Sequence, residues 1–152
     1  KGQKDMENIF YEGQIIWSMT DANGHLRHSA YADLAAQARL GAMDQIGLTK
    51  ALFKQKIGPI LFREELVYLR ELRLSEHVKV SAEIIKIRPD YSRFHVKSTI
   101  YRASDGTKCA EVTVETALLD LTLRKIAKAP EDTIPLFDQL PKSVDFTIEE
   151  KK

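Results

Sequence analysis

Residues 20–31 read TDANGHLRHSAY and join a strand-like segment to an alanine-rich helical segment. Asp21 ends the strand-like segment, Asn23 and Gly24 favour a turn, and a helix start follows. The first N–H groups of a helix have no acceptor within the helix, so this order brings a carboxylate and free N–H donors together. Such a place can polarise a carbonyl group and direct a base or a nucleophile to it.

The segments on either side of this stretch have a regular hydrophobic pattern. Residues 9–17 alternate between apolar and polar side chains, which predicts a strand with one buried face. Residues 29–46 predict a helix with Ser29 as its N-cap and Gly47 just after its end. One face of this helix is apolar and mostly small: Tyr31, Leu34, Ala35, Ala38, Ala42 and Ile46. Small residues permit close approach, so we expect the sheet to wrap around this helix.

Four more segments are strand-like and are joined by short connections. They are residues 60–69, 78–87, 93–101 and 110–123. Short connections favour antiparallel pairing because parallel strands need long crossovers. One strand, one helix and then a run of strands predict the α+β class. One helix cannot cover both faces of such a sheet, so we expect self-association, with a homodimer as the commonest case.

Length and composition are typical of one globular domain. The 152 residues are 43% hydrophobic and 30% charged, and we expect residues 6–130 to form the domain and residues 131–152 a partly ordered C-terminal extension. The net charge of +1 gives no reason to expect nucleic-acid binding. No apolar run is long enough to insert into a membrane, and no secretory signal is recognisable. The single cysteine, Cys109, suits a reducing compartment, so we expect a cytoplasmic protein.

One set of residues resembles a known signature: Asp21-x-x-Gly24-His25-x-x-His28-x-x-Tyr31, followed by Ala38-Arg39. The signature is that of hot-dog-fold acyl-CoA thioesterases, and the nearest group is the 4-hydroxybenzoyl-CoA thioesterase-like family. The resemblance extends over about residues 8–130. It implies the hot-dog fold, a curved antiparallel sheet wrapped around one long central helix. It also implies a homodimer or homotetramer with active sites at the subunit interface, and no metal or cofactor.

The resemblance assigns roles to the residues of the opening stretch. The aspartate of the family motif acts as general base or nucleophile toward the thioester carbonyl, and it corresponds to Asp21. Backbone N–H groups at the helix start polarise that carbonyl. The N–H of His28 is the expected donor, and its side chain is a further catalytic candidate. The expected substrate-binding residues are Gly24, His25, Arg27 and Tyr31.

Three basic residues, Lys86, Arg88 and Arg93, flank one predicted turn. Lysine and arginine bind phosphate groups, so these residues are candidates for the phosphates of coenzyme A. A solvated charge cluster is the alternative. His25 and His28 have a spacing that suits a metal, but two histidines are too few ligands, so we expect no metal site.

The predicted activity is hydrolysis of an acyl-CoA to a carboxylic acid and free CoA. Two alternatives stay open: a thioesterase acting on acyl groups carried by acyl carrier protein, and a module that binds acyl-CoA without turnover. Many family members carry an acid in the first turns of the helix, where this sequence has Ala36 and Gln37. Asp21 is therefore expected to carry the chemistry, and a plain turn-forming role for it is the structural alternative.

Overall fold

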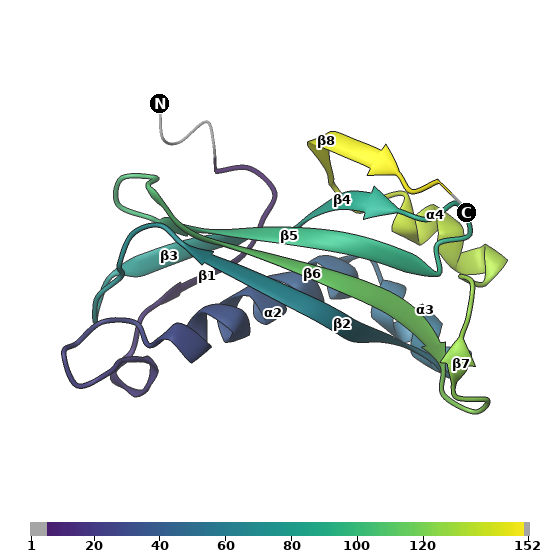
Figure 1. Ribbon diagram of the computed structural model, residues 1–152, viewed down its shortest axis with the longest axis horizontal. Helices are drawn as coiled ribbons and strands as arrows, with labels where there is room; N and C mark the ends of the chain where they lie inside the picture. Colours follow the sequence, from purple (N-terminus) through teal and green to yellow (C-terminus); the bar gives the residue numbers. More distant parts are fainter. Residues whose placement is uncertain (1–5, 151–152) are drawn as a thin grey trace.

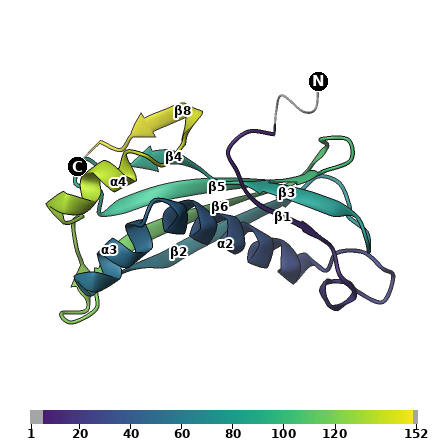
Figure 2. The ribbon, with the colours of Figure 1, turned by 180° about the vertical axis from the view of Figure 1, so that it is seen from behind.

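The computed structural model describes residues 6–150 and shows one long helix against a face of a curved sheet (Figures 1 and 2). Residues 1–5 and 151–152, which include the end of the predicted C-terminal extension, lie outside the described part. The helical elements are η1 (Trp17–Met19), α2 (His28–Gln45), α3 (Leu48–Lys54), η2 (Glu131–Thr133) and α4 (Ile134–Phe137). The strands are β1 (Ile9–Gln14), β2 (Ile57–Tyr68), β3 (His77–Ser81), β4 (Glu83–Ile87), β5 (Arg93–Arg102), β6 (Lys108–Asp120), β7 (Lys125–Ile126) and β8 (Lys142–Ile148).

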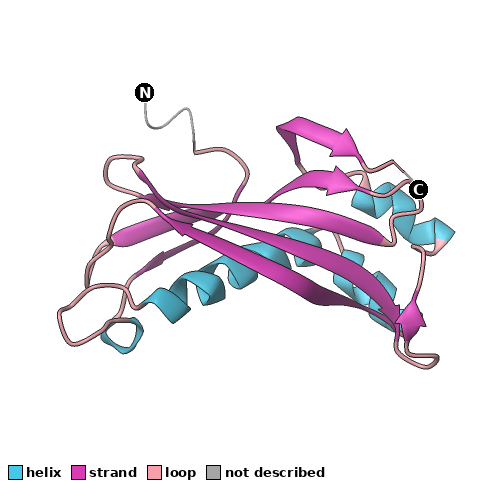
Figure 3. Cartoon of the chain, viewed as in Figure 1, coloured by secondary structure: helices cyan, strands magenta, loops and turns pink. Residues whose placement is uncertain are grey.

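The long strands β5 and β6 form the middle of the sheet. β6 pairs with β2 on its other side, and β5 pairs with both β3 and β4. β1 then pairs with β3, and β8 with β4. The β4–β8 pair is parallel, and the other pairs are antiparallel as predicted. Helices α2 and α3 lie on one side of the long strands, which confirms the α+β class and the curved sheet around a central helix (Figure 3).

Helix α2 packs closely because four of its six buried side chains are alanines, and only Tyr31 and Leu34 are large. Ala35 and Ala38 are fully buried, and Ala30 and Ala42 are nearly so. These alanines favour the helix by propensity and also let the sheet approach the helix backbone. The predicted buried face is therefore confirmed.

Different signals set the two ends of helix α2. The helix begins at His28, and the N-cap is Arg27, whose side chain makes no capping hydrogen bond. The predicted N-cap, Ser29, is therefore wrong, because Ser29 already lies inside the first turn. At the other end, Gly47 has φ +76°, a conformation that glycine adopts without strain, and it confirms the predicted stop.

Four predicted strands have clearly different limits in the structure. The strand predicted over 110–123 spans Lys108–Asp120, because the chain turns at residues 121–124. The strand predicted over 9–17 ends at Gln14, because the chain then bends into η1 and Trp17 is 80% exposed. The strand predicted over 78–87 is divided at Ala82 into β3, which pairs with β1, and β4, which pairs with β8. β2 begins at Ile57 and includes Pro59. A proline fits there because β2 is an edge strand with one neighbour.

The C-terminal segment packs against the rest of the sheet. Its helix α4 covers Ile134–Phe137. Phe137 is 1% exposed and makes edge contacts with the rings of Tyr91 and Phe94. β8 then joins the sheet beside β4 (Figure 1). Residues 131–148 thus contribute both a core side chain and a strand.

Candidate active site

Asp21 lies on a tight exposed turn rather than at the end of a strand. Its carboxylate Oδ1 accepts the N–H groups of Asn23 at 2.8 Å and His25 at 3.1 Å. These bonds, that of His25 foremost, hold the pKa of Asp21 below its usual value of 3.8. Gly24 has φ +77°, which closes the turn without strain. Asp21 is therefore an ionised carboxylate, and within residues 6–150 its Oδ2 has no hydrogen-bond donor.

The start of α2 offers free backbone donors close to this turn in the chain. The N–H of Ala30 bonds to Arg27 O at 3.0 Å. Those of His28 and Ser29 have no acceptor within the described part of the chain, as expected for the first turn of a helix. The helix dipole adds a partial positive charge at the same place. The His28 N–H is thus suited to the donor role predicted for it, and its side chain is exposed.

Most of the predicted substrate-binding residues support the turn. The Arg27 guanidinium donates to Ser18 O and to Ser29 Oγ, which joins η1 to the start of α2. His25 Nε2 lies 3.4 Å from Glu71 Oε1. The structure thus brings Gly24 and His25 into hydrogen-bond contact with Asp21, whereas Arg27 contacts η1 and the helix start. The contact of these three residues with substrate stays a prediction.

Tyr31 lies in the core beneath the helix start. Its side chain is 4% exposed, and burial raises the pKa of its phenol. Its ring contacts the ring of Tyr68 edge-on, with centroids 5.1 Å apart. Tyr68 is half exposed, and its hydroxyl reaches His28 O at 3.5 Å. The end of β2 therefore borders the helix start, and Tyr68 is the aromatic side chain of this pair that faces outward.

Sequence reasoning missed the loop between β2 and β3, residues 69–76. Leu26 N–H donates to Leu72 O at 2.7 Å, and Leu74 N–H donates to Gly24 O at 2.9 Å. These two bonds join the loop to the Asp21 turn. The bonded residues are 46 and 50 positions apart in the chain, so no local pattern in the sequence indicates this pairing.

The three basic residues predicted for CoA phosphates do lie together. Lys86, Arg88 and Arg93 line a groove of about 630 Å³ together with Phe62, His95, Glu115, Thr116, Thr147, Ile148, Glu149 and Glu150. The Arg93 guanidinium lies over the Phe62 ring at 4.6 Å, and Arg88 Nε lies 3.2 Å from Glu149 Oε2. The groove lies at the β4–β8 end of the sheet, whereas the loop before α2 lies at the opposite end (Figure 1). Within one chain the structure therefore separates the basic residues from Asp21.

A second hollow, of about 160 Å³, lies between α2 and the sheet. It is lined by Arg39, Ala42, Met43, Pro59, Ile60, Leu61, Ala82, Glu83, Ile84, Phe94, Val96, Thr116, Leu140 and Pro141. Most of these side chains are apolar. Burial lowers the pKa of the Arg39 guanidinium, and the charge of nearby Glu64 opposes that effect. The hollow is therefore suited to a hydrocarbon group.

Within residues 6–150, no His, Cys, Asp and Glu side chains form a group of three or more that could hold a metal ion. No helix in that part of the chain has the length and apolar character needed to span a membrane.

The fold and the acid-turn-helix site define a class, the hot-dog-fold thioesterases. The sequence matches the thioesterase-like superfamily over residues 15–137, so the chain belongs to this superfamily. The resemblance recognised in the sequence is thereby confirmed, and with it the prediction of a thioester hydrolase at the level of the class. A search of curated proteins gave no significant match.

Solved structures share this fold at low sequence identity. YbaW from Escherichia coli superposes with a TM-score of 0.77 at 14% identity, over 87% of this chain and 98% of that chain. The 1,4-dihydroxy-2-naphthoyl-CoA thioesterase Slr0204 from Synechocystis gives 0.71 at 17% identity, over 85% and 96% of the two chains. The Staphylococcus aureus protein SAV2348, solved in complex with CoA, gives 0.76 at 19% identity, over 91% and 89%. These likenesses establish the hot-dog fold.

Proposed function

We propose that this protein hydrolyses the thioester of an acyl-CoA, releasing a carboxylic acid and free CoA, with Asp21 as its catalytic carboxylate. The observation that carries the proposal is the Asp21 turn itself. An ionised carboxylate with one unoccupied oxygen stands a few residues before unpartnered N–H groups at a helix start. A member of the thioesterase-like superfamily needs such a pair of groups, because its reaction requires both a base or nucleophile and an oxyanion donor.

In the general-base route, Asp21 takes a proton from water while the water oxygen bonds to the thioester carbon. The His28 N–H donates to the carbonyl oxygen as that oxygen gains negative charge. The carbon–sulfur bond then breaks, and the thiolate of CoA leaves and is protonated. In the nucleophilic route, Asp21 Oδ2 bonds to the carbon first, the thiolate leaves, and water hydrolyses the resulting anhydride. Hydrolysis in ¹⁸O-water under single-turnover conditions identifies the nucleophilic route if water adds to the Asp21 side of the anhydride, because the carboxylic acid is then unlabelled after the first turnover and Asp21 carries the label.

Thiol release from short, long and aromatic acyl-CoAs tests the proposal. Asp21→Asn is expected to lower kcat by at least about 10²-fold, the magnitude typical of a lost catalytic group. Asp33→Asn is the matched control, because Asp33 is an exposed aspartate on helix α2, away from the turn. Activity of Asp21→Asn within a few-fold of the wild type would exclude this role. Faster turnover of acyl groups on acyl carrier protein would favour that donor, and CoA-ester binding without thiol release would favour a binding module.

We further propose a homo-oligomer that pairs through β2. Among residues 6–150 this strand pairs with β6 alone, so its second edge has no partner strand there. Leu61, Phe62, Val67 and Tyr68 are all at least 43% exposed along it. An open edge strand with exposed apolar side chains is a template for a second copy. Light scattering is expected to give a multiple of the monomer mass for the wild type and the monomer mass for Val67→Lys.

The oligomer also offers a place for the phosphates of CoA. In an antiparallel pair of β2 strands, the first half of one strand lies beside the second half of the other. The basic groove around Phe62 in one subunit then approaches the helix start near Tyr68 of the other. This arrangement supports Lys86, Arg88 and Arg93 as phosphate ligands acting across the interface. Lys86→Gln with Arg93→Gln is expected to raise KM for acyl-CoA and leave kcat nearly unchanged.

We place the protein in the cytoplasm. Its single cysteine, Cys109, is buried and unpaired, which agrees with a reducing compartment, and CoA esters are water-soluble substrates. Fractionation of cells that express the tagged protein tests this proposal.

A further inference from the structure

The Asp21 turn depends on a neighbouring loop for its position. Asp21 and the next two residues are exposed and pack against no core of their own. The turn is joined to loop 69–76 by the two backbone hydrogen bonds described above, and Leu26 and Leu72 are buried beneath them. Whatever fixes this loop therefore also fixes the turn.

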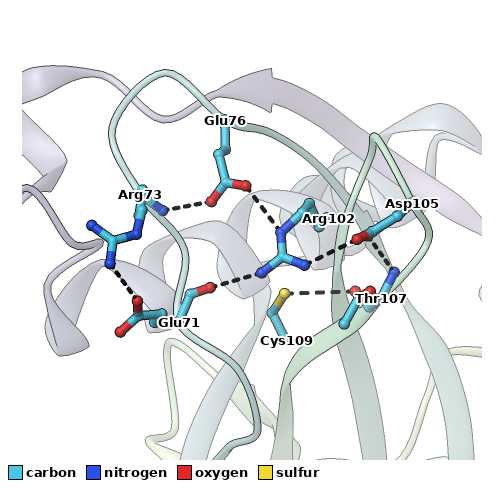
Figure 4. Close-up of polar contacts among 7 residues, drawn as sticks. All are labelled: Glu71, Arg73, Glu76, Arg102, Asp105, Thr107 and Cys109. Carbon is cyan, nitrogen blue, oxygen red and sulfur yellow. Dashed lines mark hydrogen bonds and ion pairs between the residues drawn. The ribbon is translucent and has the colours of Figure 1, made fainter.

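Arg102, at the end of β5, contacts this loop with two sides of its guanidinium group and Asp105 with the third (Figure 4). Nη2 donates to Glu71 O at 3.0 Å, and Nε lies 3.0 Å from Glu76 Oε2. Nη1 donates to Asp105 Oδ2 at 3.1 Å on the β5–β6 turn. The Arg102 side chain is only 21% exposed, so these contacts are partly shielded from solvent. The guanidinium thus ties loop 69–76 to the rigid centre of the sheet.

A continuous set of contacts leads from the loop to the carboxylate. Glu76 Oε1 accepts the N–H of Arg73 at 2.8 Å, and Glu71 Oε2 lies 2.8 Å from Arg73 Nη2. The other oxygen of Glu71 lies 3.4 Å from His25 Nε2. The backbone N–H of His25 in turn donates to Asp21 Oδ1 at 3.1 Å.

We propose that Arg102 is a positioning residue for thioester hydrolysis, which fixes loop 69–76 and through it the turn that presents the Asp21 carboxylate. This inference rests on the proposed function. Arginine suits the role because its planar group offers several donors in a fixed geometry, whereas lysine offers a single point charge. A displacement of about 1 Å at a reacting group can cost about 10²-fold in rate. Arg102 makes no contact with the residues expected to bind substrate, so its loss should reduce kcat and leave KM nearly unchanged.

Steady-state kinetics of single and double variants test this role. Arg102→Gln is expected to lower kcat by about 10- to 100-fold with KM within about twofold. Arg102→Lys should recover part of this loss. In the Asp21→Asn background, Arg102→Gln should cause less than about a twofold further loss, because its effect passes through Asp21. Asp132→Asn is the control, since it removes a side-chain charge that contacts Gln55 Nε2 at 3.0 Å and belongs to η2, outside the loop, the Asp21 turn and the proposed β2 interface.

Amide hydrogen exchange gives a second measurement that needs no activity. In Arg102→Gln, protection of the Leu26 and Leu74 amides should fall, while that of amides in the β5–β6 pair should persist. If Arg102→Gln does not fold, Glu76→Gln, which removes one of the three contacts, should show the same changes at smaller amplitude. If Arg102→Gln loses this amide protection but the wild type releases no thiol from acyl-CoA, the proposed function is rejected. The structural coupling between loop 69–76 and the turn is then retained.

If the wild type is active, either of two results would reject the role of Arg102. One is unchanged kcat and unchanged exchange in Arg102→Gln. The other is an equal loss of kcat from Arg102→Gln in the wild-type and Asp21→Asn backgrounds.

Discussion

Replacement of Phe137 by alanine tests whether the C-terminal segment belongs to the core of the domain. Phe137 is 1% exposed, and its ring lies edge-on to Tyr91 at 5.6 Å and to Phe94 at 5.5 Å. Truncation of a fully buried phenylalanine costs about 3–5 kcal/mol, because it removes transfer free energy and leaves a cavity. For a domain of this size each kcal/mol lowers Tm by about 2–4 °C, so the expected decrease is about 6–20 °C.

Thermal and urea unfolding measure this effect. The urea midpoint should fall while the slope m stays the same, because the surface exposed on unfolding changes little. Val144→Ala is the control in the same segment: Val144 is fully exposed on β8, so its truncation should change stability by no more than about 0.5 kcal/mol. A decrease in Tm below about 2 °C for Phe137→Ala would show that this segment does not pack on the domain, and would refute the reasoning.

Three further predictions concern the turn and the effect of pH. Gly24→Ala and Gly47→Ala each place a Cβ in open space at φ near +77°, so both should lose about 1 kcal/mol of stability, but only Gly24→Ala should reduce kcat. The lowered pKa of Asp21 predicts that kcat/KM stays constant down to about pH 4 and falls only below the ordinary pKa of a carboxyl group. A half-maximal kcat/KM near pH 6 would assign the base to another group. Burial lowers the pKa of His95 below 6.5 despite nearby Glu115, so the unfolded state takes up the proton at a higher pH than the folded state. The free energy of unfolding should therefore fall as the pH drops through 6.5. In urea titrations, His95→Asn but not His77→Asn should flatten this dependence.

Much of the fold was predictable because local patterns and tertiary packing agree. The small-residue face of the helix predicted its burial, and the structure confirms it with Ala35 and Ala38 fully buried. Antiparallel pairing of the later strands followed from the short connections between them. Helix limits were predicted to within one residue at each end, although the N-cap was assigned to Ser29 instead of Arg27. Capping by a backbone bend without a side-chain bond leaves no signal in the sequence.

The errors in the strands come from contacts between distant segments. At Ala82 the predicted strand changes its outer partner from β1 to β8, and both partners lie far away in the chain, so no local window contains this signal. β8 was not predicted although Val144, Phe146 and Ile148 alternate with polar residues; its strand is defined by the parallel partner β4, which lies far away in the chain. The start of β2 at Ile57 was missed because a proline predicts a break, although an edge strand tolerates one.

The sequence by itself determined the turn from Asp21 to the helix start, because the acid, the glycine and the helix follow one another within a few residues. It therefore determined the family and the candidate carboxylate. Only the tertiary structure decided what holds that carboxylate, since Leu72, Glu71 and Arg102 come from a loop and a strand 50 to 81 positions away in the chain. The structure also gathered Lys86, Arg88 and Arg93 in one groove and placed that groove at the far end of the sheet. Local spacing encodes a turn, but the partners of the turn are set by which strands pair, and pairing depends on the packing of the whole chain.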